Sequence, residues 1–250
     1  YVNNTVTGNT IETTENPIRV SKNEDGNDPL VIEDNTFETS YVVLNDGNYD
    51  IYFYANGTVK DYLSPSGDYT LVIDTLTDKD IVINSGSNIL ITGKEGAGFI
   101  NDGTIYLDGG ADGLVGSITI SGLTFTNTNK GAVDIAEYCT LITIQGNTMN
   151  IVGDASTASP TLYSVNAIAP HGYIYGLAIV DNNITVTGDH PYINGIYSIQ
   201  WPYASESPTN FIVSGNTFDI EGLSETGSCA AIYLEASDLT IENNNITVKS

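Results

Sequence analysis

Basic residues are scarce in this sequence. Its 250 residues include seven Lys and Arg against 31 Asp and Glu, which gives a formal net charge of −24 at pH 7. A protein that binds nucleic acid needs a cationic surface facing the phosphates, so nucleic acid is excluded as a partner. An anionic membrane surface is disfavoured for the same reason. High acidity suits solubility, a saline setting, or divalent cations that bridge carboxylates.

Long apolar runs are missing as well. No run reaches about 18 apolar residues, the length of a spanning helix, so we expect no membrane insertion in this segment. No secretory signal is visible, but the chain starts at Tyr1 without Met and stops at Ser250 on a predicted strand. We therefore expect a segment of a longer protein, in which an absent signal means little.

A short repeated phrase dominates the rest of the chain. It reads ITISGLTF, ITIQGNTM, LAIVDNNI, FIVSGNTF and LTIENNNI, with an apolar anchor before a polar turn. The anchors recur every 24 to 35 residues, after a weaker copy at Ile91, and are Ile120, Ile144, Ile179, Val213 and Ile241. Self-similarity at this period is typical of a solenoid.

The turn of each copy predicts a sharp corner and a ladder. Two residues after the anchors stand residues that tolerate a left-handed backbone: Gly122, Gly146, Asp181, Gly215 and Asn243. One position later, asparagine recurs at Asn147, Asn182, Asn216 and Asn244, with Leu123 as the exception. Asparagines stacked at the strand spacing of about 4.8 Å can hydrogen-bond amide to amide.

Two further registers repeat in phase with the turn. The first holds inward apolar residues after it: Phe125, Met149, Ile184, Phe218 and Ile246, then Ile151, Val186, Ile220 and Val248. The second pairs a small residue with a branched one: Ala132-Val133, Ala167-Ile168, Gly195-Ile196 and Ala231-Ile232. Chance in a β-prone composition seldom produces two registers that agree in order.

These patterns predict an all-β fold. The main alternative is an antiparallel sandwich, but the Asn-Gly hairpins it favours are limited to Asn56-Gly57 and Asn194-Gly195. Parallel crossovers are right-handed as a rule. We therefore expect a right-handed single-stranded parallel β-helix, a solenoid with about three strands per coil and an N-terminal cap.

The chain divides into three expected parts. Residues 1–40 are polar and are predicted to be an N-terminal extension or linker, with a strand at Leu30–Ile32. Residues 41–70 are rich in aromatics and are predicted to form the N-terminal cap that the bare end of a solenoid needs. Residues 71–250 are predicted to form the parallel β-helix coils, beginning with strands at 71–73, 81–83 and 89–91.

These motifs carry a family resemblance over roughly residues 41–250. The stretch YDIYFYANGTVKD, the following TLVID and DIVINSGSNILITG, and the I-x-G-N-T-F coils resemble the adhesin-like surface proteins of methanogenic archaea. Those proteins have parallel β-helix repeats of the pectate-lyase-like superfamily. The resemblance implies an extracellular, cell-surface location and a role in attachment.

The pectate-lyase-like superfamily also includes lyases, but the basic residues of this sequence do not favour lyase chemistry. A uronate lyase commonly uses Arg or Lys to abstract a proton, and none of the seven bases falls between 131 and 248. The hydrolase elements Gly-His-Gly and Arg-x-Lys are absent too. A pair of carboxylates could still cleave a glycoside, and the candidates are Asp154, Asp181, Asp189, Glu206 and Glu235.

No cofactor is expected. The one feature that leaves calcium open is DGGADG at Asp108–Gly113, which is similar to a calcium-binding turn but occurs once. The two cysteines, Cys139 and Cys229, lie about three coils apart in the alignment, or roughly 14 Å at strand spacing, so a disulfide cannot join them. We expect two reduced, mostly buried thiols.

Binding is predicted where the repeat is broken. The turn at Ala136–Thr140 is short, and we expect longer ones at Pro170–Gly176 and Gln200–Asn210, on the same edge of adjacent coils. Together they would present the candidate ligand-binding residues His171, Tyr173, Tyr175, Trp201, Tyr203 and Glu206. On the opposite edge, loops at 152–166 and 187–194 add Tyr163 and Tyr192. Exposed aromatics with a polar rim stack on sugar rings, although these side chains could instead cover the flank of the solenoid.

Three functions follow, in order of preference. The first is a non-enzymatic, extracellular adhesin-like segment that binds a glycan, or a protein on another cell surface, through loop aromatics. The second is a structural stalk of a surface protein. The third is a glycan-active hydrolase or lyase. We expect a monomer.

Overall fold

The computed structural model describes most of the chain from residue 69 onwards and five strands before it. The described residues are 69–250 without 74–75, 79, 84–85, 110–114, 137, 160–161 and 199–208. The five earlier strands are β1 (Asn4–Thr7), β2 (Thr10–Ile11), β3 (Leu30–Glu33), β4 (Thr36–Phe37) and β5 (Val42–Asn45).

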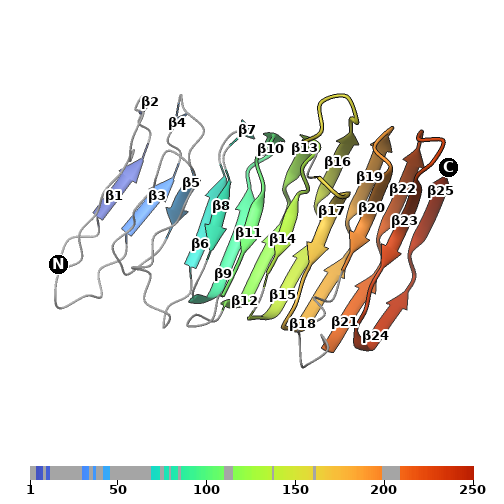
Figure 1. Ribbon diagram of the computed structural model, residues 1–250. Helices are drawn as coiled ribbons and strands as arrows, with labels where there is room; N and C mark the ends of the chain where they lie inside the picture. Colours follow the sequence, from blue (N-terminus) through green and yellow to red (C-terminus); the bar gives the residue numbers. More distant parts are fainter. Residues whose placement is uncertain are drawn as a thin grey trace.

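Three parallel sheets form the main body, and each coil contributes one strand to each sheet, except that the coil of β24 and β25 has none in the third (Figure 1). The first sheet contains β6 (Tyr69–Ile73), β9 (Gly86–Gly93), β12 (Val115–Ser121), β15 (Cys139–Gln145), β18 (Ile174–Val180), β21 (Thr209–Ser214) and β24 (Ser237–Glu242). The second contains β7 (Leu76–Thr77), β10 (Gly98–Asn101), β13 (Thr124–Thr128), β16 (Thr148–Gly153), β19 (Asn183–Gly188), β22 (Thr217–Gly222) and β25 (Asn245–Lys249). The third contains β8 (Ile81–Ile83), β11 (Ile105–Leu107), β14 (Val133–Ile135), β17 (Val165–Pro170), β20 (Tyr192–Tyr197) and β23 (Ser228–Tyr233).

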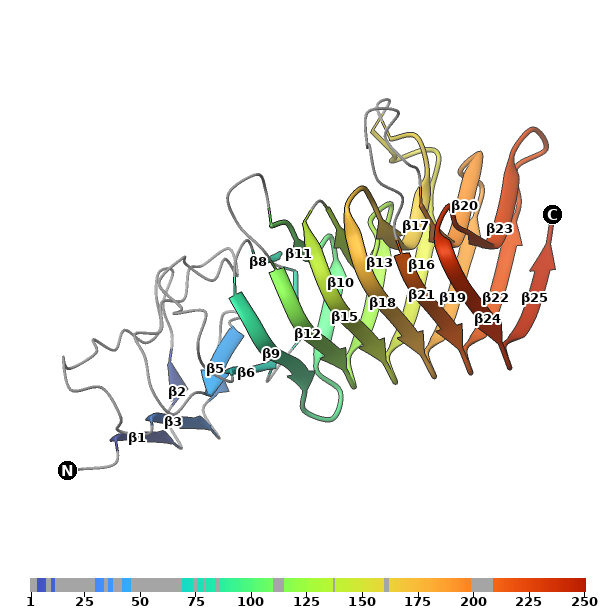
Figure 2. The same ribbon diagram turned by 90° about the horizontal axis from the view of Figure 1, so that it is seen from below.

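The described part of the chain is thus all-β and forms a parallel, β-helix-like solenoid. Its coils stack in chain order from β6 to β25, as the view from below also shows (Figure 2). The strands expected at 71–73, 81–83 and 89–91 are present within β6, β8 and β9. None of the described residues forms a helix long and apolar enough to cross a bilayer.

The anchors predicted from the repeat are register partners in the first sheet. Ile91 pairs with Ile120, and the pairing continues through Ile144, Ile179, Val213 and Ile241. The row from Phe125 to Ile246 is likewise one line across the second sheet, and the row from Val133 to Ile232 crosses the third. Both inward registers are therefore confirmed.

The core lies between the three sheets and is filled by these rows. The four largest fully buried side chains are Phe99, Phe125, Phe211 and Phe218. Phe99 and Phe125 stack with their ring centroids 4.9 Å apart and their planes 6° from parallel. Strand alternation gives every coil the same few inward positions, so a side chain packs on its equivalent in the next coil.

The corner between the first and second sheets is formed as predicted. Its residues have positive φ: Gly122 (66°), Gly146 (62°), Asp181 (55°), Gly215 (69°) and Asn243 (55°). The next residue in four of these corners carries the ladder. Asn147 Nδ2 donates to Asn182 Oδ1, Asn182 Nδ2 to Asn216 Oδ1, and Asn216 Nδ2 to Asn244 Oδ1, each at 3.0 Å.

The ladder amides also satisfy backbone groups inside the solenoid. Asn182 Oδ1 accepts the Asn147 N–H at 3.0 Å, and Asn182 Nδ2 donates to the Ile144 carbonyl at 2.9 Å. Asn147 and Asn216 make equivalent bonds. A buried backbone polar group left without a partner is costly, so asparagine at this position permits the sharp corner.

The strands that precede the coils pair with one another and with the first coil. At the N-terminal side, β1 pairs with β3 and β2 with β4, both in parallel, while β5 runs antiparallel to β6. The expected strand at Leu30–Ile32 is present as β3. Residues 46–68 of the predicted cap lie outside the described residues, and the division at 40 and 70 stays a prediction.

Both cysteines are free as expected, with Cys139 buried and Cys229 half-buried.

The turn expected to be long at Pro170–Gly176 is short. Pro170 ends β17 and Ile174 begins β18. Ile135 pairs with Pro170 and Cys139 with Ile174, so this turn has the same length as the one before it. The prediction was wrong because both strands extend into the PHGYIYG stretch, whose aromatic residues take ordinary strand and turn positions.

Candidate functional site

The outer surface of the third sheet carries a row of register-equivalent side chains. Tyr106 pairs with Asp134 and Asp134 with Ala169. Ile168 pairs with Ile196, so the residues that follow them, Ala169 and Tyr197, are equivalent in register. Tyr197 in turn pairs with Tyr233. The strand neighbours of Tyr106, Asp134, Ala169 and Tyr197 are buried and those of Tyr233 are half-buried, so alternation turns this row outwards, although Ala169 itself is only 9% exposed. Successive members lie about 4.8 Å apart, the spacing of adjacent strands.

Two stacked tyrosine pairs lie at this surface. Tyr197 and Tyr233 have ring centroids 5.0 Å apart, and Tyr163, from the β16–β17 loop, stacks on Tyr192 at 5.1 Å with planes 10° apart. Tyr163, Tyr233 and Tyr192 are 62%, 49% and 38% exposed. The two pairs share β20, which begins at Tyr192 and ends at Tyr197. Burial raises the pKa of Tyr197, and Tyr163, Tyr233, Glu235 and Tyr192 add to the rise. We call Tyr163, Tyr192, Tyr197 and Tyr233 the tyrosine face.

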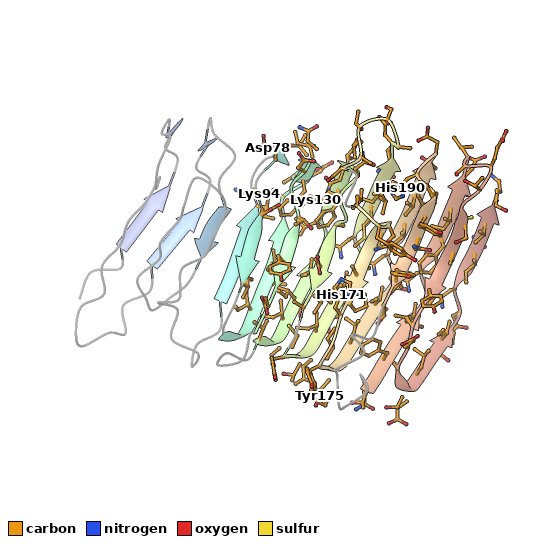
Figure 3. All side chains as sticks on the ribbon, viewed as in Figure 1. Asp78, Lys94, Lys130, His171, Tyr175 and His190 are labelled. Carbon is orange, nitrogen blue, oxygen red and sulfur yellow. The ribbon has the colours of Figure 1, made fainter. Side chains whose placement is uncertain are left out.

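A cavity of about 270 Å³ opens on the same sheet, on the β14–β17 side of the tyrosine face. Ala169 lines it at the point where the outward row has its smallest side chain, and Leu162 and Ser164 line it from the β16–β17 loop. Lys130, Asp134 and His171 supply its charged and titratable groups. Figure 3 shows His171 over the middle of the sheet and Lys130 nearer the edge where the second and third sheets meet.

Opposite charges meet around this cavity. His171 Nε2 lies 3.5 Å from Asp134 Oδ1, and Lys130 Nζ contacts the two carboxylate oxygens of Asp80 at 2.8 and 2.9 Å. Burial raises the pKa of the Asp134 carboxyl, and nearby Asp108 adds to the rise, against the opposite effects of His171 and Lys130. Burial therefore outweighs the opposing effects of His171 and Lys130 on the pKa of Asp134.

Two buried polar atoms at the cavity lack a hydrogen-bond partner. They are Asp134 Oδ1 and His171 Nδ1. The 3.5 Å contact between their side chains is longer than a good hydrogen bond. Nearly all buried polar atoms in folded proteins are hydrogen-bonded, so an unsatisfied pair beside a cavity indicates a place for a polar ligand.

The structure separates the site residues predicted from the sequence. His171 lies at the cavity, but Tyr173 stacks on Tyr138 in the turn, with centroids 5.2 Å apart. Tyr175 lies beyond the next corner on β18, 36% exposed, and Figure 3 shows it at the lower edge, away from His171. Trp201, Tyr203 and Glu206 lie outside the described residues.

Sequence reasoning missed Asp134, Ala169, Tyr197 and Tyr233. Each directly follows a member of the inward row Val133, Ile168, Ile196 and Ile232. The signal was therefore present, because the residue after an inward one on a strand faces out. Tyr163 and Tyr192 were expected on a common edge, and they stack there.

Three of the acids proposed for glycoside cleavage have structural roles in turns and loops. Asp154 Oδ1 accepts hydrogen bonds from the Ser156 N–H and hydroxyl, and these bonds lower the pKa of Asp154. Asp189 Oδ1 accepts the Ala155 N–H at 2.8 Å, and Asp181 forms a corner with positive φ. Asp154, Asp181, Asp189 and Glu235 are not among the residues that line the cavity.

The described residues form no candidate metal site. Within them, no group of three or more His, Cys, Asp or Glu side chains could hold an ion. The DGGADG turn, at which the sequence leaves calcium open, lies in part outside the described residues, since 110–114 are not among them.

Comparison with known proteins adds no relative. No protein-family model, curated protein or solved structure matches this chain.

Proposed function

We propose that this chain is a non-enzymatic, extracellular segment of an adhesin-like surface protein, which binds glycan through exposed aromatic side chains. The observation that carries the proposal is the tyrosine face, two stacked pairs exposed beside a polar cavity on one sheet. The cell-surface location and the role in attachment rest on the family resemblance of the sequence. We also propose right-handed winding and a cap at residues 41–70.

Tyrosine is suited to carbohydrate for a physical reason. A sugar ring has an apolar face of C–H groups and a rim of hydroxyls, and the phenol ring offers a flat apolar surface with a polar end. In each stacked pair the two rings cover one face of each other, so a sugar would stack on the outer face of the more exposed ring, Tyr163 in one pair and Tyr233 in the other. Tyr192, Tyr197 and Tyr233 are on strands and Tyr163 is stacked on Tyr192, so little side-chain entropy is lost on binding.

The proposal is tested by glycan-array binding of the purified chain, followed by titration of the best ligand. Tyr233→Ala and Tyr163→Ala should each weaken binding about tenfold, or 1.4 kcal/mol. Ile212→Ala is the matched control, because Ile212 is 44% exposed on the first sheet, and it should bind like the wild type. Trp201→Ala and Tyr203→Ala form a separate arm that tests the loop aromatics predicted from the sequence. Absence of binding by the wild type would leave the stalk as the function.

One observation favours a second candidate, a glycan-active hydrolase. Asp134 is a carboxyl with a raised pKa at a cavity, which is the property of a general acid. Release of reducing ends from plant or cell-wall polysaccharides, abolished in Asp134→Asn, would establish this activity. Unchanged polysaccharide after prolonged incubation would reject it.

A further inference from the structure

We propose that the cavity beside Ala169 holds one uncharged sugar unit of a glycan whose adjoining units lie on the tyrosine face. This inference deepens the proposed function and rests on it. It assigns a ligand class and a direction: the bound chain crosses β14, β17 and β20 along the axis of the solenoid.

The size of the cavity comes from a gap in the outward row. Tyr106 and Tyr197 are large, whereas Ala169 between them ends at its methyl group. The β16–β17 loop supplies Leu162 and Ser164 as lining on another side of this gap. Pockets for drug-sized ligands hold roughly 300–1,000 Å³. A volume of about 270 Å³ therefore suits one small ring and not a disaccharide.

The polar lining matches hydroxyl groups. Asp134 and His171 line the cavity with side chains that are 42% and 28% exposed, and Ser164 and Asn166 add further polar groups to the lining. A sugar hydroxyl both donates and accepts, so neighbouring hydroxyls can satisfy the carboxylate and either tautomer of the imidazole. Leu162 and Ala169 supply the apolar contact that the C–H face of a ring requires.

The charges of the lining favour an uncharged sugar over a uronate. Lys130 could hold an acidic sugar, but its ammonium is already bound to both oxygens of Asp80. Asp134 lies next to the site, and the whole chain carries a formal charge of −24. An anionic sugar would bring a further negative charge into this acidic cavity, where the Lys130 ammonium is already paired with Asp80.

The experiment titrates the chain with cellotetraose, mannotetraose, xylotetraose and tetragalacturonate by calorimetry. The wild type should bind at least one of the neutral tetrasaccharides and bind tetragalacturonate at least tenfold more weakly. Ala169→Leu fills the cavity and should weaken neutral binding at least tenfold. The control is Ala178→Leu, the same change at an outward position of β18 in the first sheet, which should bind like the wild type.

A second variant guards against a folding defect in Ala169→Leu. Asp134→Asn keeps the shape of the side chain but weakens the acceptor for a sugar hydroxyl, and it should reduce affinity three- to tenfold. Circular dichroism of each variant checks that the strands are intact.

The outcomes separate this inference from the proposed function. If Tyr233→Ala loses binding while Ala169→Leu and Asp134→Asn bind like the wild type, the tyrosine face is correct and the cavity inference is wrong. Preference for tetragalacturonate would overturn the uncharged class alone. If the wild type binds none of the four probes and no glycan on the array, the proposed function and the inference both fail.

Discussion

Asp134 illustrates how burial acts on a single residue of this solenoid. It stands on the outer side of the third sheet, yet the β16–β17 loop and His171 surround it closely enough that burial raises its pKa. The ordinary value for this group is 3.8. The native state therefore holds the Asp134 proton more tightly than the unfolded chain does.

This shift predicts the direction of a pH effect on stability. The contribution of Asp134 is fully present below pH 3.8 and is lost as the pH rises through the native pKa, since the folded chain must then ionise a partly desolvated carboxyl. Its side chain is 42% exposed, so solvent screening keeps this effect small. Asp134→Asn cannot ionise, so the wild type should lose stability relative to the variant between about pH 4 and neutrality. Urea midpoints of both proteins across this range measure the difference, and parallel curves would contradict the prediction.

The two thiols should differ in reactivity. Cys139 is fully buried and burial raises its pKa to about 12, whereas Cys229 is half-buried on β23. Because the thiolate is the reactive form, Ellman's reagent at pH 8 should label Cys229 first and Cys139 only after unfolding. The single variants Cys139→Ala and Cys229→Ala assign the two phases. Equal rates in the native state would show that Cys139 is accessible.

At the scale of the element, the corner between the first and second sheets depends on its asparagine ladder. Each interior ladder residue bonds the coils on both sides and caps a strand carbonyl within the core. The solenoid thus turns sharply in every coil without leaving buried amides unsatisfied. The corner is architectural, and none of the four asparagines lines the cavity.

Removing an interior asparagine should therefore cost more than removing the last one. Asn182→Ala removes the side-chain partner of the buried Asn147 N–H and of the Ile144 carbonyl and one of the two bonds of Asn147 Nδ2, which should cost about 3–5 kcal/mol. Asn244→Ala, at the half-buried end of the ladder, should cost about 1 kcal/mol because water replaces the lost bonds. Chemical denaturation measures both, and equal losses would contradict the cooperative role of the ladder.

At the scale of the whole molecule, each coil packs only on its neighbours, so position along the axis sets the energetic weight of a residue. The inward row of the second sheet shows this: Ile184 is fully buried, while Ile246, in the last coil, is 47% exposed. Two isoleucines in the same row are thus buried to different degrees.

The same substitution in this row should have two different costs. Ile184→Ala leaves a cavity between coils and should cost about 2–5 kcal/mol. Ile246→Ala removes a half-solvated side chain at the end of the row and should cost at most about 1 kcal/mol. Comparison of the two thermal or urea midpoints tests this, and similar destabilisation would mean that the last coil is covered in solution.

The sequence by itself determined the parallel coil, the corner and both inward registers. These features depend on local rules that repeat: strand alternation, residues that tolerate positive φ, and asparagine one position after the corner. Ile120, Gly146 and Asn182 could be assigned in this way because every coil restates the same constraint. The candidate site is different, since of the three predicted residues that the structure describes, His171, Tyr173 and Tyr175, only His171 lines the cavity.

Only the tertiary structure decided where a binding surface lies. The cavity combines Asp134 from one coil, Ala169 and His171 from the next, and Leu162 from the loop between β16 and β17, and no single repeat contains that combination. Loop lengths were misjudged at PHGYIYG because a strand can extend into a segment with turn-like residues when its neighbour offers free backbone hydrogen bonds. Stacking of coils, which places residues 35 apart side by side, is what turns an ordinary row of outward residues into a site.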